Sequence, residues 1–94
     1  MSKAETLQLI SDEYDRAVAK FGAFHNAHEG WGVIREEYLE LEEEIRKKQR
    51  DYDFVQMRKE AMQLGAMALR FIVDVCGDGL ERPMTDSEIE AMES

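Results

Sequence analysis

The sequence has very little of what cross-links a chain or carries it across a membrane. It contains one cysteine among 94 residues, so no disulfide can form within the chain. Its first residues, which include Lys3 and Glu5, lack the apolar run of a signal peptide. The longest uncharged stretch in the apolar part of the chain, residues 61–69, lies between Glu60 and Arg70. Because roughly 20 apolar residues are needed to span a bilayer, we expect a cytoplasmic protein without a transmembrane helix.

Positive charge is also scarce. Twelve lysines and arginines stand against 21 aspartates and glutamates, which gives a net charge of −9. Residues 78–94 hold six acids and one arginine, so this acidic C-terminal extension alone carries −5. A chain this acidic is poorly suited to neutralise nucleic-acid phosphates or an anionic membrane surface, and we expect neither as a partner. Its length corresponds to a single domain over residues 1–94.

Proline occurs only once, as Pro83, beside six methionines. Both features favour helices, because proline breaks a helix and methionine is a good helix former. The composition is 44% hydrophobic and 35% charged, an ordinary balance for a globular protein. We therefore expect an all-α helical bundle of three main helices with a short C-terminal helix.

Apolar residues recur at intervals of three and four along the first part of the chain, as on one face of an amphipathic helix. This pattern predicts a first helix over residues 2–24. The polar residues and glycine within 25–30 predict a turn. A second apolar stripe predicts a second helix that ends in the basic run 46–50, where cations favour the negative end of the helix dipole. Residues 51–53 are then the second connection.

The third predicted helix, residues 54–76, is the longest and the most apolar. Much of its circumference is apolar, and one stripe carries most of its polar side chains, namely Gln56, Glu60, Gln63, Arg70 and Asp74. At a rise of 1.5 Å per residue such a helix reaches ~37 Å, more than two shorter helices of one chain readily cover. We therefore expect self-association into a homo-oligomer, either a dimer or a tetramer.

The end of the third helix and the start of the last one have local signals. Gly77, Asp78 and Gly79 supply a stop signal. Beyond Pro83, the sequence Thr85-Asp86-Ser87-Glu88 has the pattern of a capping box, which predicts the short C-terminal helix.

The densest group of chemically useful residues is a run of glutamates within residues 36–44 of the second predicted helix. Glu37 and Glu40 lie on one border of the apolar stripe. Carboxylates at i and i+3 are one turn apart and can share a hard cation such as Mg²⁺. Glu60 and Gln63 repeat this spacing on the third helix, and antiparallel packing of the two helices would bring the two pairs together.

The same glutamates have a simpler interpretation as a solvent-exposed face. Pairs such as Glu43 with Lys47 stabilise an exposed helix without any ligand. Spacing alone favours this interpretation over a metal site.

Resemblance to a known family favours the metal site. The sequence Glu36-Glu37-x-x-Glu40, followed about twenty residues later by Glu60 with a polar residue three positions on, resembles the signature of the MazG-like all-α nucleoside triphosphate pyrophosphohydrolases. Residues 28–37 and 60–71 resemble a compact, often phage-associated branch of that family. The resemblance extends over residues 28–76, about half of the chain.

The resemblance implies a fold like that of the all-α NTP pyrophosphatases and a homo-oligomer that binds Mg²⁺, with Mn²⁺ as a possible substitute. It implies cleavage of a (d)NTP or related nucleotide into a monophosphate and pyrophosphate. By the same resemblance Glu37, Glu40 and Glu60 are metal ligands, and Glu36 or Glu40 is the catalytic residue that orients the attacking water. The family has Asp in the fourth ligand position, whereas this chain has Gln63, a neutral oxygen donor.

We expect Trp31, Lys48 and Lys59 to bind the substrate. Trp31 can stack on a base, although an aromatic residue at a helix start more often packs against its own helix. Lys48 belongs to a basic run that can hold phosphates, although such a run also compensates the helix dipole. The neutral Gln63 leaves an alternative open: a catalytically weak or inactive helical oligomer that acts as a nucleotide sensor or a protein-interaction module.

Overall fold

The computed structural model describes residues 1–77 and 84–93, and within these ranges all regular secondary structure is helical, with no strand. A short 3₁₀ turn, η1 (Gln49–Asp51), interrupts the second connection. The four α-helices are α1 (Lys3–Phe21), α2 (Ala27–Ile45), α3 (Phe54–Asp74) and α4 (Asp86–Ala91). The prediction of an all-α chain with three main helices and a short C-terminal helix is confirmed.

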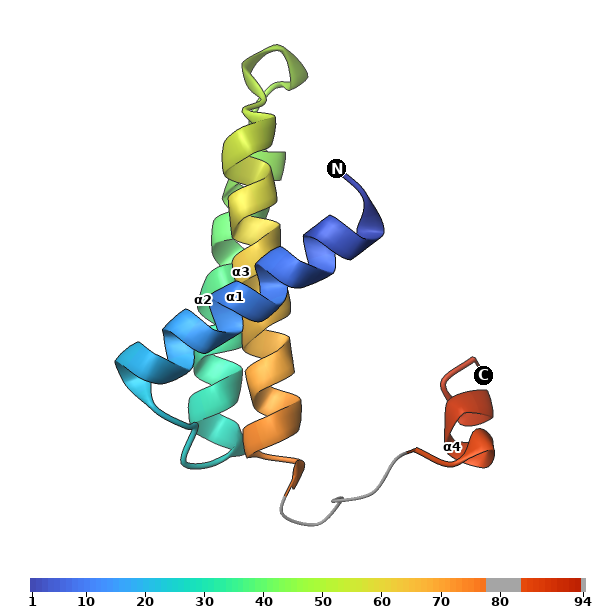
Figure 1. Cartoon of the computed structure of the whole chain (residues 1–94). Coiled ribbons are helices and arrows are strands. Elements are labelled where there is room, and N and C mark those ends of the chain that lie inside the picture. The colour runs from blue at the N-terminus through green and yellow to red at the C-terminus, as the bar shows by residue number, and fades with distance from the viewer. Residues whose placement is uncertain (78–83, 94) are drawn as a thin grey trace.

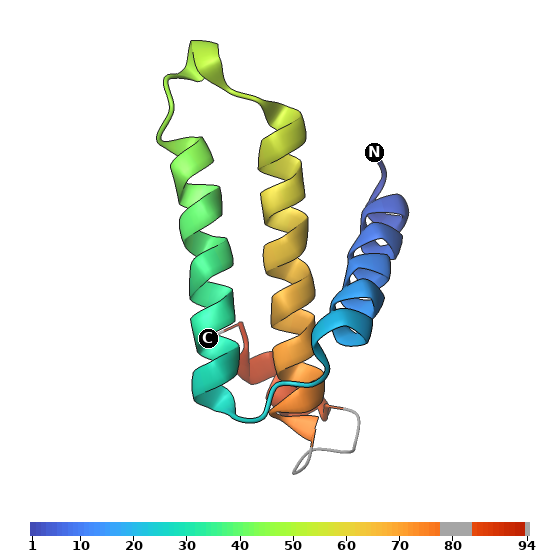
Figure 2. The same ribbon diagram turned by 90° about the vertical axis from the view of Figure 1, so that its left-hand side faces the viewer.

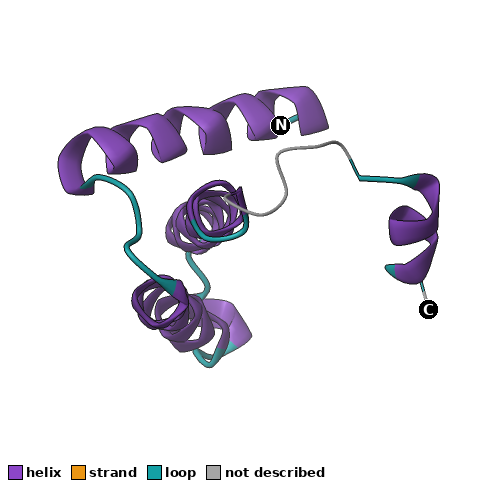
Figure 3. Ribbon diagram, turned by 90° about the horizontal axis from the view of Figure 1, so that it is seen from below, coloured by secondary structure: helices purple, strands orange, loops and turns teal. Residues whose placement is uncertain are grey.

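Helix α3 is the element against which both α1 and α2 pack. It runs antiparallel to α2, and the two lie side by side (Figure 2). On its other side, α1 crosses it obliquely (Figure 1). Seen along its axis, α3 lies between α1 and α2, while α4 stands apart from all three (Figure 3). The side chains of α3 therefore meet both of its long neighbours.

The described residues bury only a small apolar core. Its buried members are Ala17, Phe24, Ala66 and Met67, and around them pack the partly buried Ile10, Tyr14, Val33, Ile34, Phe71 and Val75. Helix α2 packs closely against α3 at Gly30, where a Cβ atom would lie 2.7 Å from Cδ2 of Phe71. A side chain at this position would force the Phe71 ring to shift, so Gly30 permits the close packing of α2 against α3 near the start of α2.

The two faces of α3 are arranged differently from an ordinary amphipathic helix. Its polar stripe contributes Glu60 and Arg70 to the interior, where they are only 7% and 3% exposed. Large apolar side chains of α2 and α3 are instead exposed to solvent, among them Leu39, Ile45, Phe54, Val55, Ile72 and Val73. The interior of the three-helix unit is therefore rich in charge, and apolar area remains on the outside.

The first connection differs from its prediction. Helix α1 ends at Phe21 rather than at residue 24, because Gly22 adopts a φ of 74° that side-chain-bearing residues disfavour. The predicted turn over residues 25–30 is wrong for residues 27–30, since α2 already begins at Ala27. The Asn26 side chain accepts a hydrogen bond from the Glu29 N–H at 2.9 Å, and this N-cap starts the helix early.

Two helices end earlier than predicted. Helix α2 ends at Ile45, so the basic run lies in the connection and not in the helix. Helix α3 ends at Asp74 rather than at residue 76, ahead of the stop signal, whose Asp78 and Gly79 lie outside the described residues. The predicted capping box at Thr85 is confirmed, because its side chain accepts a hydrogen bond from the Glu88 N–H at 3.2 Å.

Throughout residues 1–77 and 84–93, no helix combines the length and the apolar character that crossing a membrane requires.

Candidate metal centre

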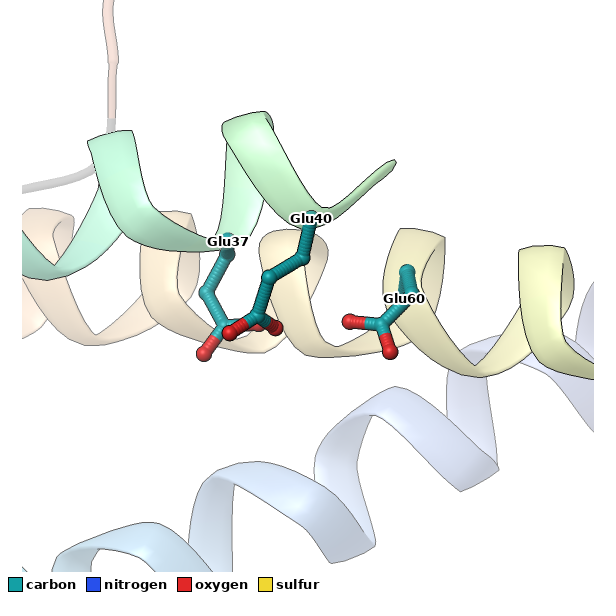
Figure 4. Close-up of side chains that lie close together, drawn as sticks. All are labelled: Glu37, Glu40 and Glu60. Carbon is teal, nitrogen blue, oxygen red and sulfur yellow. The ribbon is translucent and has the colours of Figure 1, made fainter. Parts of the chain in front are cut away.

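Three glutamate carboxylates meet in the space between α2 and α3. Glu37 and Glu40 project from successive turns of α2, and Glu60 projects toward them from α3 (Figure 4). One carboxylate oxygen from each residue lies within 4.8 Å of the other two. Oxygens this close can contact a single hard cation. We call this group the glutamate cluster.

The cluster follows from the way the α2–α3 hairpin closes. The Asp53 side chain caps α3 by accepting hydrogen bonds from the N–H groups of Val55 and Gln56. The Tyr52 hydroxyl donates to the Ile45 carbonyl at 2.8 Å, which ties the end of α2 to the start of α3. In an antiparallel hairpin, residues at equal distances from the middle of the connection face each other. Residue 60 lies as far beyond the middle of the 46–53 connection as residue 39 lies before it, so Glu60 faces α2 between residues 37 and 40.

The carboxylates are only partly satisfied by the protein. Oε1 of Glu60 accepts a hydrogen bond of 2.6 Å from Nε2 of Gln56. The other oxygen of Glu60 is buried and has no hydrogen-bond partner within the described part of the chain, and the same holds for Oε2 of Glu37. Buried polar atoms are almost always paired in folded proteins. Two unpaired oxygens in one cluster fit a cation that would occupy the space between them.

Burial and neighbouring carboxylates raise the pKa values of Glu37 and Glu60. Burial, followed by the charge of Glu40 and then that of Glu60, raises the pKa of Glu37 from 4.5 to about 7. Burial and the neighbouring Glu40 also raise the pKa of Glu60, although Gln56 and Lys59 oppose this increase. The ionised cluster is therefore costly without a counter-charge, and a bound cation would remove that cost.

A cavity of about 710 Å³ adjoins the cluster. All three long helices line it, and Glu36, Glu37 and Gln63 contribute to its wall. Glu37 thus belongs both to the glutamate cluster and to the cavity. The volume lies within the usual range of small-ligand pockets, about 300 to 1,000 Å³. A ligand in this cavity would reach a cation held by the cluster.

Arg70 is a residue of the cavity wall to which the sequence assigned no role. Its guanidinium lies over the Phe24 ring at 4.0 Å from the centroid, and Nη2 donates a hydrogen bond of 2.8 Å to the Gly22 carbonyl. One turn further along α3, Asp74 accepts a hydrogen bond of 2.9 Å from the Phe24 N–H. Together Arg70 and Asp74 hold the α1–α2 connection against α3. The only sequence signal was the presence of two charged residues, four apart, in a long apolar helix.

Only some of the remaining predicted site residues line a cavity. Lys59 lines a second cavity of about 330 Å³, between α1 and α3, and Gln63 lines both cavities. Trp31 is 59% exposed and is not part of the wall of the larger cavity. Lys48 is the N-cap of η1 in the second connection and lines neither cavity. The structure therefore brings Glu36, Glu37 and Gln63 to one cavity, but not Trp31 or Lys48.

Comparison with known proteins adds no relative: no family model, no curated protein and no solved structure matches the chain. The indications of function in this chain are therefore the glutamate cluster, its neighbouring cavities and the motif resemblance.

Proposed function

We propose that the protein is a Mg²⁺-dependent nucleotide pyrophosphohydrolase, which cleaves a (d)NTP or related nucleotide into the monophosphate and pyrophosphate. The observation that carries this proposal is the convergence of Glu37, Glu40 and Glu60 within 4.8 Å beside a cavity of about 710 Å³. Carboxylate oxygens suit Mg²⁺, which commonly binds substrate phosphates as well as protein. The resemblance of the glutamate motif to that of the MazG-like enzymes points to the same chemistry.

The proposed reaction is attack of water on the α-phosphorus. A bond forms between the water oxygen and this phosphorus, and the bond to the oxygen bridging the α and β phosphates breaks. Pyrophosphate leaves with the bridging oxygen, and the proton of the water is released. Glu37, Glu40 and Glu60 would hold Mg²⁺, which would neutralise phosphate oxygens and lower the pKa of the attacking water. Glu36 or Glu40 orients this water by accepting its hydrogen bond.

The larger cavity supports a nucleotide rather than a bare phosphate as the ligand. Phe21, Phe24 and Met67 give its wall apolar surface, and its charged side chains are the cations Arg16, Lys20 and Arg70 beside the glutamates Glu13, Glu29, Glu36 and Glu37. A nucleoside needs both flat apolar contacts and polar partners, which is the usual composition of a small-molecule pocket. Because Glu37 lines the same cavity, a nucleoside in it would present its phosphates to the glutamate cluster.

A pyrophosphate-release assay over a panel of ribonucleoside and deoxyribonucleoside triphosphates tests the proposal. The wild-type protein should release pyrophosphate with Mg²⁺ or Mn²⁺ and not after treatment with a chelator. Glu40→Gln should lower the rate at least about 100-fold, because it removes a charged ligand from the metal. The matched control is Glu43→Gln, which changes an exposed glutamate on the same helix and should retain the wild-type rate.

The neutral Gln63 makes a catalytically inactive nucleotide sensor the second candidate. This candidate is supported if Mg²⁺ and a nucleotide bind but no nucleotide of the panel releases pyrophosphate. That result would contradict the proposed enzyme activity.

We also propose that the protein self-associates into a homo-oligomer, a dimer or a tetramer. Support comes from the small buried core and from exposed apolar side chains such as Ile72 on α3 and Leu39 on α2. Large apolar surfaces on soluble proteins commonly mark interfaces. Light scattering at micromolar concentration should therefore give a mass of at least twice 10.9 kDa. A fully helical monomer of 10.9 kDa would contradict the proposal.

A further inference from the structure

The smaller cavity, between α1 and α3, has an unusual charge for this chain. Its wall includes three cationic side chains, Arg16, Arg58 and Lys59, and one carboxylate, that of Glu13. The side chains of the wall therefore sum to +2, in a protein whose net charge is −9. We call this cavity the basic groove.

Two of the three cations are available to a ligand. Arg58 and Lys59 are exposed, and neither forms an ion pair with any residue in the part of the chain that the structure describes. Arg16 is paired with Glu13 at 2.7 Å, within one turn of α1 and on the surface. An exposed pair of this kind contributes little stability, so Arg16 can turn to a stronger anion at small cost.

The basic groove adjoins the larger cavity. Glu13, Arg16 and Gln63 line both, and Glu37 connects the larger cavity with the glutamate cluster. Lys59 also directly precedes Glu60 of the cluster. Glu60, Gln63 and Lys59 therefore follow one another round α3, from the side that faces α2 to the side that faces α1.

We propose that the basic groove holds the terminal phosphates of a polyphosphate ligand, with Arg58 and Lys59 as its main anion-binding groups and Arg16 as the third. The nucleoside then lies in the larger cavity, the α-phosphate lies at the glutamate cluster, and the β and γ phosphates extend past Gln63 into the groove. This orientation rests on the proposed function. It assigns the leaving pyrophosphate to a site of its own, on the side of α3 that faces α1.

Calorimetric titration with inorganic pyrophosphate in saturating Mg²⁺ tests the groove without requiring catalysis. The double variant Arg58→Gln, Lys59→Gln should bind pyrophosphate about tenfold more weakly than the wild type, because two charge-assisted contacts are lost. Its affinity for Mg²⁺ alone should stay within about twofold. The control variant Arg35→Gln, Arg50→Gln removes the same charge from two other exposed positions and should bind pyrophosphate like the wild type. Circular dichroism verifies that both variants are folded, and the single variant Lys59→Gln provides a milder change.

Two further titrations distinguish the terminal phosphates from a general phosphate effect. An α,β-imido nucleoside triphosphate, which resists cleavage between the α and β phosphates, should lose the same factor of about ten in the double variant, whereas a nucleoside monophosphate should lose less than about twofold. Equal pyrophosphate affinity in the double variant and the wild type, or no pyrophosphate binding by the wild type, overturns the groove. Absence of hydrolysis with pyrophosphate binding that depends on Arg58 and Lys59 overturns the enzyme proposal alone and leaves the groove standing.

Discussion

Replacing Glu60 by Gln should stabilise the metal-free protein and abolish its stabilisation by Mg²⁺. Glu60 is 7% exposed, one of its oxygens has no partner among the described residues, and the Glu40 carboxylate lies beside it. A neutral amide removes the buried charge, yet its oxygen can still accept the hydrogen bond from Gln56. At pH 8 we expect a gain of about 1 kcal/mol, which raises the melting temperature of a domain this small by about 4–8 °C.

In the presence of Mg²⁺ the same substitution should lower the stability relative to the wild type instead of raising it. At about 100 times its Kd, Mg²⁺ stabilises the wild type by about 2.7 kcal/mol, or more than about 10 °C. Glu60→Gln should lose most of this increase, because one of three charged ligands is gone. Thermal unfolding monitored by circular dichroism, with and without Mg²⁺, measures both effects, and Glu43→Gln is the matched control.

Two outcomes would contradict this account. A full Mg²⁺ response in Glu60→Gln would exclude Glu60 from the metal site. A lower melting temperature of the metal-free variant would mean that the Glu60 carboxylate stabilises the fold, so that the cluster is a structural feature and not a strained binding site. A variant that merely destabilises the fold cannot imitate the expected pair of opposite changes.

The glutamate cluster could be predicted from the sequence because it depends on short-range regularities. Glu37 and Glu40 share a face of one helix by periodicity, and the short connection between α2 and α3 makes the two helices antiparallel. These two facts together place Glu60 opposite them. The same reasoning gave the number and class of the helices, because amphipathic spacing and capping residues are local signals.

The two cavities could not be predicted in this way. Their walls depend on how α1 crosses α3, and that crossing is held by contacts between residues distant in sequence. Arg70 reaches the carbonyl of Gly22 and Asp74 reaches the N–H of Phe24, over separations of 48 and 50 residues. Periodicity shows only that Arg70 and Asp74 belong to a polar stripe. It does not show that this stripe faces the interior, because a charged stripe ordinarily faces water.

The start of α2 was missed for a related reason. Glycine and polar residues at 25–30 resemble a turn when each residue is considered separately. In the structure Asn26 caps the helix, and Gly30 is needed for the close approach of Phe71. The composition of this segment therefore reflects helix capping and packing, and only its first part forms the connection.

The affinity of the protein for Mg²⁺ should rise about tenfold between pH 6 and pH 8. The pKa of Glu37 is raised to about 7, so this ligand is mostly protonated at pH 6 and mostly ionised at pH 8. Binding of Mg²⁺ near pH 7 should release protons from Glu37 and, to a further extent, from Glu60. Calorimetry in buffers of different ionisation enthalpy measures both the affinity and the number of protons released.

The stability of the metal-free protein should change with pH in the opposite direction. The pKa of Glu37 is higher in the folded state than its ordinary value of 4.5, so between pH 4.5 and 7 the folded state binds more protons than the unfolded state. The stabilisation that Glu37 provides is full below pH 4.5 and is lost as the pH rises through 7. After allowance for solvent screening of this partly exposed group, the loss is about 1–2 kcal/mol.

The variant Glu37→Gln isolates this contribution from those of the other acids. The metal-free variant should have nearly the melting temperature of the wild type at pH 4.5 and a higher one at pH 8, since its side chain is neutral throughout. In saturating Mg²⁺ the order at pH 8 should reverse, because the wild-type carboxylate then holds the cation. A constant difference between the two proteins from pH 4.5 to 8, or a Mg²⁺ affinity that does not change between pH 6 and 8, would show that Glu37 is ionised in the folded protein at all these values. In that case the cluster would bind Mg²⁺ without competition from protons, and the carboxylates would not be strained in the absence of metal.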